Sequence, residues 1–151
     1  MLDPKIVKSI MKVLDYRAKV LEALAEFESY AMWKKQLLAV YVERYGPGMF
    51  RILRVRRGGD KYDTYLVFKY ADSKTVVVED ANAVEQFKKY IEAKSTARAT
   101  LKHYMALLRK LEEAEEPLAK KAAKVLKREA LKLRKKIASL ERFSTSRKQS
   151  S

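Results

Sequence analysis

The apolar residues in the first third of the chain recur at the 3.6-residue period of an α-helix. Asp3 and Pro4 open this segment with an N-cap side chain and the residue favoured at the first helical position. No helix breaker follows before Gly46, so we expect one helix over residues 4–44.

The second half of this expected helix has an unusual pattern, because from residue 30 onwards its apolar residues point in nearly every direction. A helix that is apolar all round is covered on several sides. One short chain has little left to cover it, so we expect a neighbouring subunit to do so. The residues expected at this oligomer interface are Tyr30, Trp33, Leu37, Leu38 and Tyr41.

The pattern changes between residues 49 and 79 to one typical of β-strands. Three runs rich in β-branched and aromatic residues, 49–56, 62–70 and 75–79, are separated by turn sequences around Gly58 and Asp72. We therefore predict a three-stranded antiparallel β-meander over residues 49–79.

Helical spacing then returns and continues to residue 143. Pro117 follows a run containing four glutamates and marks a point where one helix ends and another begins. We expect helices over 82–115 and 118–143, joined as a helical hairpin, and a polar tail over 144–151. The predicted fold is a single α+β domain over residues 1–143, mostly α, with three long helices and the meander between the first and the second.

The last predicted helix carries the strongest chemical signal, because its polar side is almost wholly cationic. Residues 118–143 include ten Lys or Arg and two Glu, and they supply eight of the chain's fifteen net positive charges. The apolar stripe expected to face inward comprises Leu118, Ala122, Val125, Leu126, Leu133, Ile137 and Leu140. The residues expected to contact nucleic acid from the opposite side are Lys120, Lys121, Lys124, Lys127, Arg128, Lys132 and Lys135. A face of one sign is typical of a protein that binds a polyanion.

A merely solvated face is the alternative interpretation, because lysine-rich helices are common in proteins from hot environments. The chain fits that profile, with a single asparagine and no cysteine. Glutamate usually rises together with lysine in such proteins, however, whereas here 34 basic residues outnumber 19 acidic ones. The charge balance therefore favours a polyanionic partner.

A second basic cluster lies at the end of the first predicted strand, where Arg54, Arg56 and Arg57 follow one another closely. Guanidinium groups bind phosphates bidentately, so the cluster is a second candidate nucleic-acid site. Charge that protects an edge strand from pairing is an equally good explanation.

Combinations of residues suited to catalysis are scarce. His103 is the only histidine, and the sequence has no cysteine, P-loop or dinucleotide-binding fingerprint, so we predict a non-enzymatic protein without metal or cofactor. Asp63 and Glu79 match part of a metal-dependent nuclease pattern, but Ala81 stands where that pattern requires lysine. A nuclease is therefore the less favoured reading. No apolar run is long enough for a membrane span, and the first residues lack the pattern of a signal peptide.

A long helix that begins near residue 4, the absence of cysteine, scattered tyrosines and a mainly helical remainder resemble the coat proteins of filamentous viruses of hyperthermophilic archaea. The resemblance implies a nucleocapsid subunit that wraps linear double-stranded DNA and holds it in A form. It also implies a location in the virion, or otherwise in the cytoplasm, and places Lys5, Lys8 and Lys12 of the first helix against the DNA.

These features together predict a sequence-independent nucleic-acid-binding and packaging protein that self-assembles on DNA, alone or with a paralogous subunit. A cellular chromatin-like protein and a basic helical module for an acidic protein partner are the alternatives. DNA or RNA as the ligand, and a dimer or a filament as the assembly, both remain open.

Overall fold

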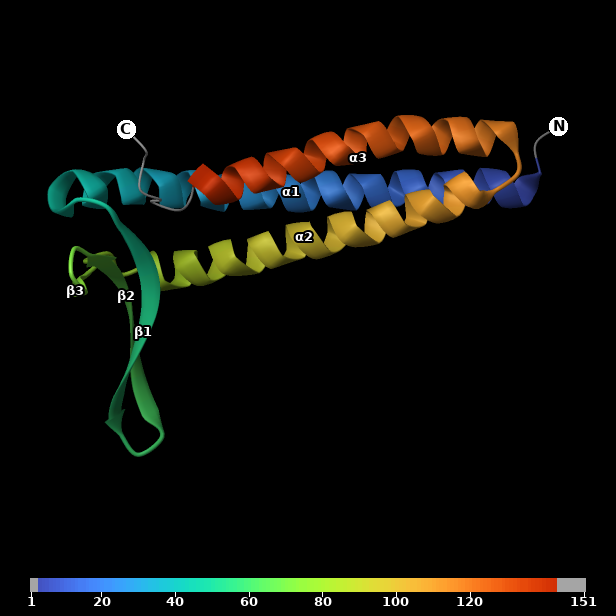
Figure 1. The fold of residues 1–151 in the computed structure, drawn as a ribbon. Coiled ribbons are helices and arrows are strands. Elements are labelled where there is room, and N and C mark those ends of the chain that lie inside the picture. Colours follow the sequence, from blue (N-terminus) through green and yellow to red (C-terminus); the bar gives the residue numbers. More distant parts are fainter. Residues whose placement is uncertain (1–2, 144–151) are drawn as a thin grey trace. The chain divides into compact units, whose positions relative to one another are not determined.

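The computed structural model describes residues 3–143, which form three helices and one antiparallel sheet (Figure 1). The elements in chain order are α1 (Pro4–Tyr45), β1 (Gly48–Gly58), β2 (Lys61–Tyr70), β3 (Lys74–Val77), α2 (Ala83–Glu113) and α3 (Pro117–Phe143). The predicted mostly helical α+β fold, with a three-stranded meander between the first and second helices, is confirmed. The polar tail predicted over residues 144–151 lies outside the described residues.

The helix ends are set by local chemistry. Asp3 accepts a hydrogen bond from the backbone N–H of Lys5 at 3.0 Å, and so caps α1. Gly46 ends the same helix with a φ of 93°, which L side chains rarely adopt, and its N–H donates to the Val42 carbonyl at 2.8 Å. Glu116 caps α3, since its carboxylate accepts the backbone N–H of Ala119 at 2.8 Å.

The chain divides into two compact units. Within the described residues, unit 1 comprises 3–27 and 93–139, and unit 2 comprises 28–92 and 140–143.

Unit 1 is a bundle in which segments of α1, α2 and α3 run side by side (Figure 1, blue, gold and orange). The buried residues of α2 recur at alternating steps of four and three, the spacing of a coiled-coil seam, and those of α1 and α3 follow this spacing less regularly. In α2 this seam consists of Ala97, Leu101, Tyr104, Leu108 and Leu111.

The buried side of α3 agrees only in part with the stripe that the sequence predicts, since Ile137 and Leu140 are buried as expected and other positions differ. Ala119, Ala123 and Ala130 are fully buried, whereas Leu118 and Val125 are 44% and 59% exposed. The prediction ranked positions by hydrophobicity and therefore favoured leucine and valine. Alanine occupies the buried positions here because its small side chain lets the backbone of α3 approach the neighbouring helices closely.

An ion pair links α1 to α3 inside unit 1. The Arg17 guanidinium donates two hydrogen bonds to the Glu129 carboxylate, at 2.5 and 2.8 Å. The hydrogen bond from Arg17 lowers the pKa of Glu129 below its usual value. The fully buried Tyr104 lies near this pair, and burial, followed by the Glu129 charge, raises the pKa of its phenol to about 12.

Unit 2 contains the sheet, whose strand order is β1-β2-β3. Phe50 and Phe68 face each other across β1 and β2 and are both buried, with ring centroids 5.3 Å apart. Tyr41 of α1 packs on both rings, at 5.6 and 5.5 Å. Gly48 permits this packing, because a Cβ there would lie 2.3 Å from the Lys69 carbonyl oxygen and 2.7 Å from the Phe68 ring. An aromatic cluster thus joins the sheet to the helix of the same unit.

Lys34 occupies a seam position of α1 that would ordinarily be apolar. Its side chain is buried, and its Nζ lies 4.5 Å from the Tyr90 ring centroid and 5.3 Å from that of Phe87. Cation–π attraction to two rings offsets part of the cost of removing the ammonium from water.

The alanine seam gives a first prediction. Ala130→Leu should lower the free energy of unfolding by about 1–3 kcal/mol, because the larger side chain has no space at this fully buried position. Ala138→Leu makes the same change at an exposed position of α3 and should be nearly neutral. Urea unfolding followed by circular dichroism measures both. Equal stabilities of the two variants would contradict the observed seam.

The Arg17–Glu129 pair gives a second prediction. Glu129→Gln should lower the free energy of unfolding by about 1 kcal/mol at pH 7, because both partners are about one-third exposed. Since the folded-state pKa of Glu129 is lowered, its stabilising effect is complete above the unfolded-state pKa, and is lost as the pH falls through the folded-state pKa. The wild-type protein and the Glu129→Gln variant should therefore have similar free energies of unfolding at acid pH. Glu22→Gln, at an exposed position of α1, is the control and should show no such pH dependence.

Candidate nucleic-acid interface

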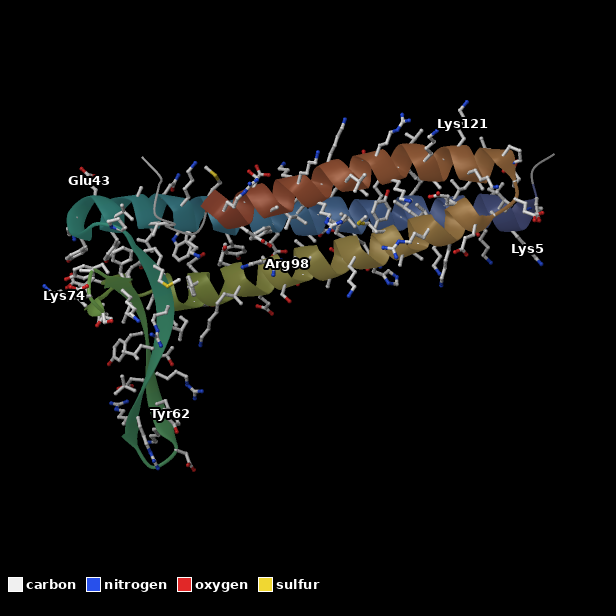
Figure 2. The ribbon with its side chains drawn as sticks, viewed as in Figure 1. Lys5, Glu43, Tyr62, Lys74, Arg98 and Lys121 are labelled. Atoms are coloured by element: carbon white, nitrogen blue, oxygen red, sulfur yellow. The ribbon has the colours of Figure 1, made fainter. Side chains whose placement is uncertain are left out.

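The outward face of α3 in unit 1 is strongly cationic, with the exposed apolar residues Leu118 and Val125 on the same side. Its exposed basic residues lie on the side of the helix opposite the alanine seam, and Lys121 projects away from α3 (Figure 2). The surface spans about 22 Å of helix axis, at about 1.5 Å per residue. We call it the α3 face; its exposed residues are Lys120, Lys121, Lys124, Arg128, Lys132 and Lys135.

The α3 face has few internal counter-charges, and the Glu129 carboxylate, which attracts Lys132, is one of them. None of its six side chains takes part in an ion pair within residues 3–143. Glu129, the acidic residue of α3 in unit 1, is engaged by Arg17 on the inner side. The charges of this face are thus available to an external anion.

Lys127 differs from the other predicted contacts on α3. It is half-buried, and its Nζ donates to the Glu112 carboxylate of α2 at 3.1 Å. Lys127 therefore bridges two helices, and Glu112 partly neutralises its charge. This pairing depends on the packing of α2 against α3, which the sequence does not specify.

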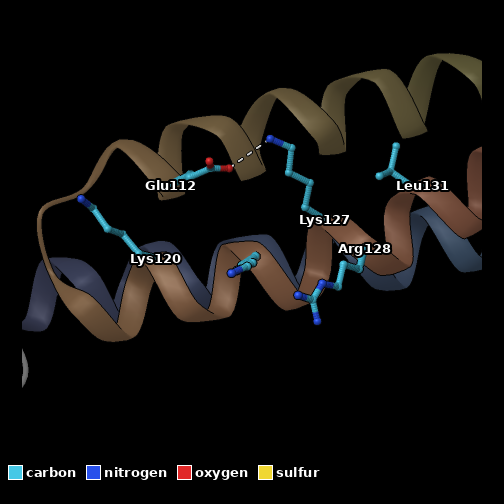
Figure 3. A pocket seen from close by; sticks show the side chains of 6 residues that line it. Glu112, Lys120, Lys127, Arg128 and Leu131 are labelled. Carbon is cyan, nitrogen blue, oxygen red and sulfur yellow. Dashed lines mark hydrogen bonds and ion pairs between the residues drawn. The ribbon is translucent and has the colours of Figure 1, made fainter.

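A shallow depression of about 520 Å³ lies beside this bridge (Figure 3). Its lining residues are Glu112, Lys120, Lys124, Lys127, Arg128 and Leu131. Four cations against one carboxylate make it attractive to a phosphate group, and Leu131, which is 44% exposed, supplies an apolar wall. The sequence placed these lysines on one face but did not indicate the depression.

The surplus of charge is concentrated in unit 1, where 19 basic residues stand against nine acidic ones. Residues 28–92 of unit 2 contain 12 basic and nine acidic residues. Repulsion among like charges destabilises a compact unit. Most of this surplus lies on α3, whose part in unit 1 has nine basic residues and one acidic residue.

The predicted arginine cluster lies in the outer part of the β1–β2 hairpin of unit 2. The Arg54 guanidinium stacks on the Tyr62 ring with its carbon 4.6 Å from the ring centroid. Arg56 donates from Nε to the Gly59 carbonyl at 3.0 Å, and Arg57 lies 3.6 Å from the Asp63 carboxylate. Arg54 and Arg56 lie on one face of the hairpin with Tyr62, which the sequence pattern did not indicate, whereas Arg57 lies beside Asp63 of the other face.

The lysines near the start of α1 form a weaker surface. Lys5, Lys8 and Lys12 are exposed and share one side of the helix. The part of α1 in unit 1 has five basic and three acidic residues, so its surplus of positive charge is small. Lys12 and Lys110 line a small depression of about 180 Å³, where α1 meets α2 within unit 1.

The residues predicted at an oligomer interface fall into two groups. Leu38 and Tyr41 are buried inside unit 2, so the argument that a second subunit must cover them does not hold. Tyr30, Trp33 and Leu37 are half-buried. Met32 and Val40, which the sequence reasoning did not select, are 44% and 49% exposed. The sheet covers this part of α1, as the packing of Tyr41 on Phe50 and Phe68 shows. The helical pattern of the sequence does not predict that the sheet packs there.

Other chemistry has little support in the described part of the chain. No group of three or more His, Cys, Asp or Glu residues there could hold a metal ion. Asp63, from the possible nuclease pattern, is engaged by Arg57, and the His103 ring packs against Tyr16 with centroids 4.6 Å apart. None of the described helices is long and apolar enough to cross a membrane.

Comparisons with known proteins found no match to this chain among protein-family models, curated proteins or solved structures.

Proposed function

We propose that this protein is a non-enzymatic, sequence-independent nucleic-acid-binding protein that packages DNA and uses the α3 face to hold phosphates. The observation that carries the proposal is the set of six exposed cations on one side of α3 that have no ion pair within the described residues. A surface of this kind is complementary to a polyanion along its whole length.

The side-chain chemistry of the α3 face favours contacts to the backbone of the nucleic acid. Five of its six residues are lysines, whose ammonium groups act as compact point charges on flexible stems. Such groups follow phosphates without reading base edges. Binding would release condensed counterions, so its affinity should depend strongly on salt.

Self-assembly on the nucleic acid forms the second part of the proposal, and exposed apolar residues of α1 in unit 2 support it. Met32 and Val40 are both more than 40% exposed. They lie on the same side of α1, about 80° apart around the helix axis. Burial of this strip against another subunit would remove apolar surface from water.

The biological setting follows the resemblance described above. A coat or nucleocapsid subunit in a virion is the role that joins phosphate binding to self-association. A cellular chromatin-like protein would use the same surfaces. An acidic protein partner would also match the α3 face, and competition between DNA and an acidic protein decides between these ligands.

The third prediction locates the contacts. The triple variant Lys124→Glu, Arg128→Glu and Lys135→Glu should abolish binding to a fluorescent 30-base-pair DNA duplex in an anisotropy titration. The matched control is Lys5→Glu, Lys8→Glu and Lys12→Glu, which changes the net charge equally and should retain binding. For the wild-type protein, about six phosphate contacts would lower the affinity by roughly a thousandfold between 50 and 200 mM salt.

Two outcomes would contradict this assignment. Loss of binding only in the first-helix variant would move the site to α1, as the viral resemblance implies. An affinity that is unchanged over this salt range would show that phosphate neutralisation is not the source of binding.

The fourth prediction concerns self-association. Met32→Glu with Val40→Glu should shift the sedimentation profile towards smaller species while helix content is preserved. Val7→Glu with Met11→Glu is the control, because these residues are 39% and 59% exposed on the part of α1 that belongs to unit 1. A wild-type protein that sediments as a monomer at high concentration would refute self-assembly through this strip.

A further inference from the structure

The outer part of the β1–β2 hairpin is a two-stranded ribbon without a covering layer. β3 pairs only with Val67–Tyr70 of β2, and the hairpin continues beyond it (Figure 1, green). We call residues 53–65 the distal ribbon. Its large apolar and aromatic side chains, Leu53, Val55, Tyr62 and Tyr65, are between 38% and 47% exposed. Two strands without a covering layer add little to a hydrophobic core. The length of the distal ribbon therefore requires another explanation.

The tip of the ribbon is shaped by its turn. Gly58 and Gly59 have φ values of 134° and 60°, which favour glycine. The register shifts between Arg56 and Gly58, so Arg57 is an extra residue in β1. Arg57 lies beside Asp63, and this ion pair joins the two strands near the tip.

Pairing across the ribbon sorts its side chains into two faces. Residues directly opposite in an antiparallel pair share a face. Arg54 pairs with Thr64 and Arg56 with Tyr62, which makes one face cationic and polar. On the other face Leu53 pairs with Tyr65 and Val55 with Asp63, so that face has three apolar or aromatic side chains and one carboxylate.

The cationic face is held in place before any ligand binds. The Arg54 guanidinium lies over the Tyr62 ring, with its carbon 4.6 Å from the ring centroid. A stacked guanidinium keeps its N–H groups free to donate in its own plane. Arg56 is fixed through Nε, which leaves its terminal nitrogens available.

We propose that the distal ribbon inserts into the major groove of double-stranded DNA, with Arg54 and Arg56 donating to phosphates and guanine edges. The major groove is about 12 Å wide and admits a two-stranded β-ribbon, whereas the minor groove is only about 6 Å wide. The inference rests on the proposed nucleic-acid binding and identifies its ligand as B-form duplex DNA. It disagrees with the A-form duplex that the viral resemblance implies, because the major groove of an A-form helix is deep and narrow.

Pairing of the free edge of β1 with another protein strand is the competing use of the ribbon. Four arginines lie along β1, at positions 51, 54, 56 and 57. A second copy of β1 would bring like charges opposite one another, which destabilises a sheet. The same charges attract a polyanion, so DNA is the occupant that the ribbon favours.

The test uses the full chain and dimethyl sulfate, which methylates guanine N7 in the major groove and adenine N3 in the minor groove. On a bound 30-base-pair duplex, the wild-type protein should protect N7 and leave N3 reactive. It should also bind duplex DNA about tenfold or more tightly than an RNA duplex of the same sequence. Arg54→Gln with Arg56→Gln should lose both the N7 protection and this preference, and should retain salt-dependent binding through the α3 face.

The matched control is Arg51→Gln with Lys74→Gln, which removes two exposed charges outside the distal ribbon and should keep the N7 protection. Four results would each overturn the ribbon proposal without affecting the proposed function. They are bound DNA whose N7 atoms stay reactive, protection of N3 instead of N7, equal affinity for the DNA and RNA duplexes, and a loss of N7 protection in the control variant equal to that in the arginine variant. Failure of the wild-type protein to bind any nucleic acid at low salt would overturn the proposed function together with it.

Discussion

The close approach of α3 to its neighbours in unit 1 is the constraint on which the cationic surface depends. Ala119, Ala123 and Ala130 are buried completely, and they set the rotation of the helix about its axis. Once these alanines face inward, the lysines between them face outward. Alanine contributes less hydrophobic area than leucine or valine, yet the buried alanines determine on which side of α3 the charges lie. A larger residue in the seam would separate the backbones and loosen this surface.

The Arg17–Glu129 pair completes this arrangement. Arg17 of α1 binds Glu129 of α3 through two hydrogen bonds, which lower the pKa of the Glu129 carboxylate. The same carboxylate also attracts Lys132, so it offsets part of the charge at one edge of the α3 face. The pair joins two helices and engages the one acidic residue of α3 in unit 1. Stability and the proposed function thus depend on one contact.

Short sequence signals, such as helix caps and glycines, were enough to predict the helices and strands. They did not predict the contacts between residues that are distant in the sequence. Asp3, Gly46 and Pro117 mark helix ends through their own backbone preferences, so the helix bounds agree with the structure within two residues. The alanine seam was missed because close backbone approach is a property of packed helices. The burial of Tyr41 and the pairing of Lys127 with Glu112 likewise depend on which element lies opposite. The exposure of the α3 lysines other than Lys127 was predicted correctly, since a helix face of one sign can be recognised without knowledge of its neighbours.

The two cationic surfaces differ in chemistry, and the difference suits them to different parts of one ligand. The α3 face is rich in lysine and broad, so it matches the outer phosphates of a nucleic acid. The distal ribbon is rich in arginine and narrow, and the guanidinium of Arg54 lies over the Tyr62 ring. Under the proposed function, the α3 face would hold phosphates and the distal ribbon would enter the groove, so each surface contributes a different class of contact. Each added subunit would extend these contacts along the DNA.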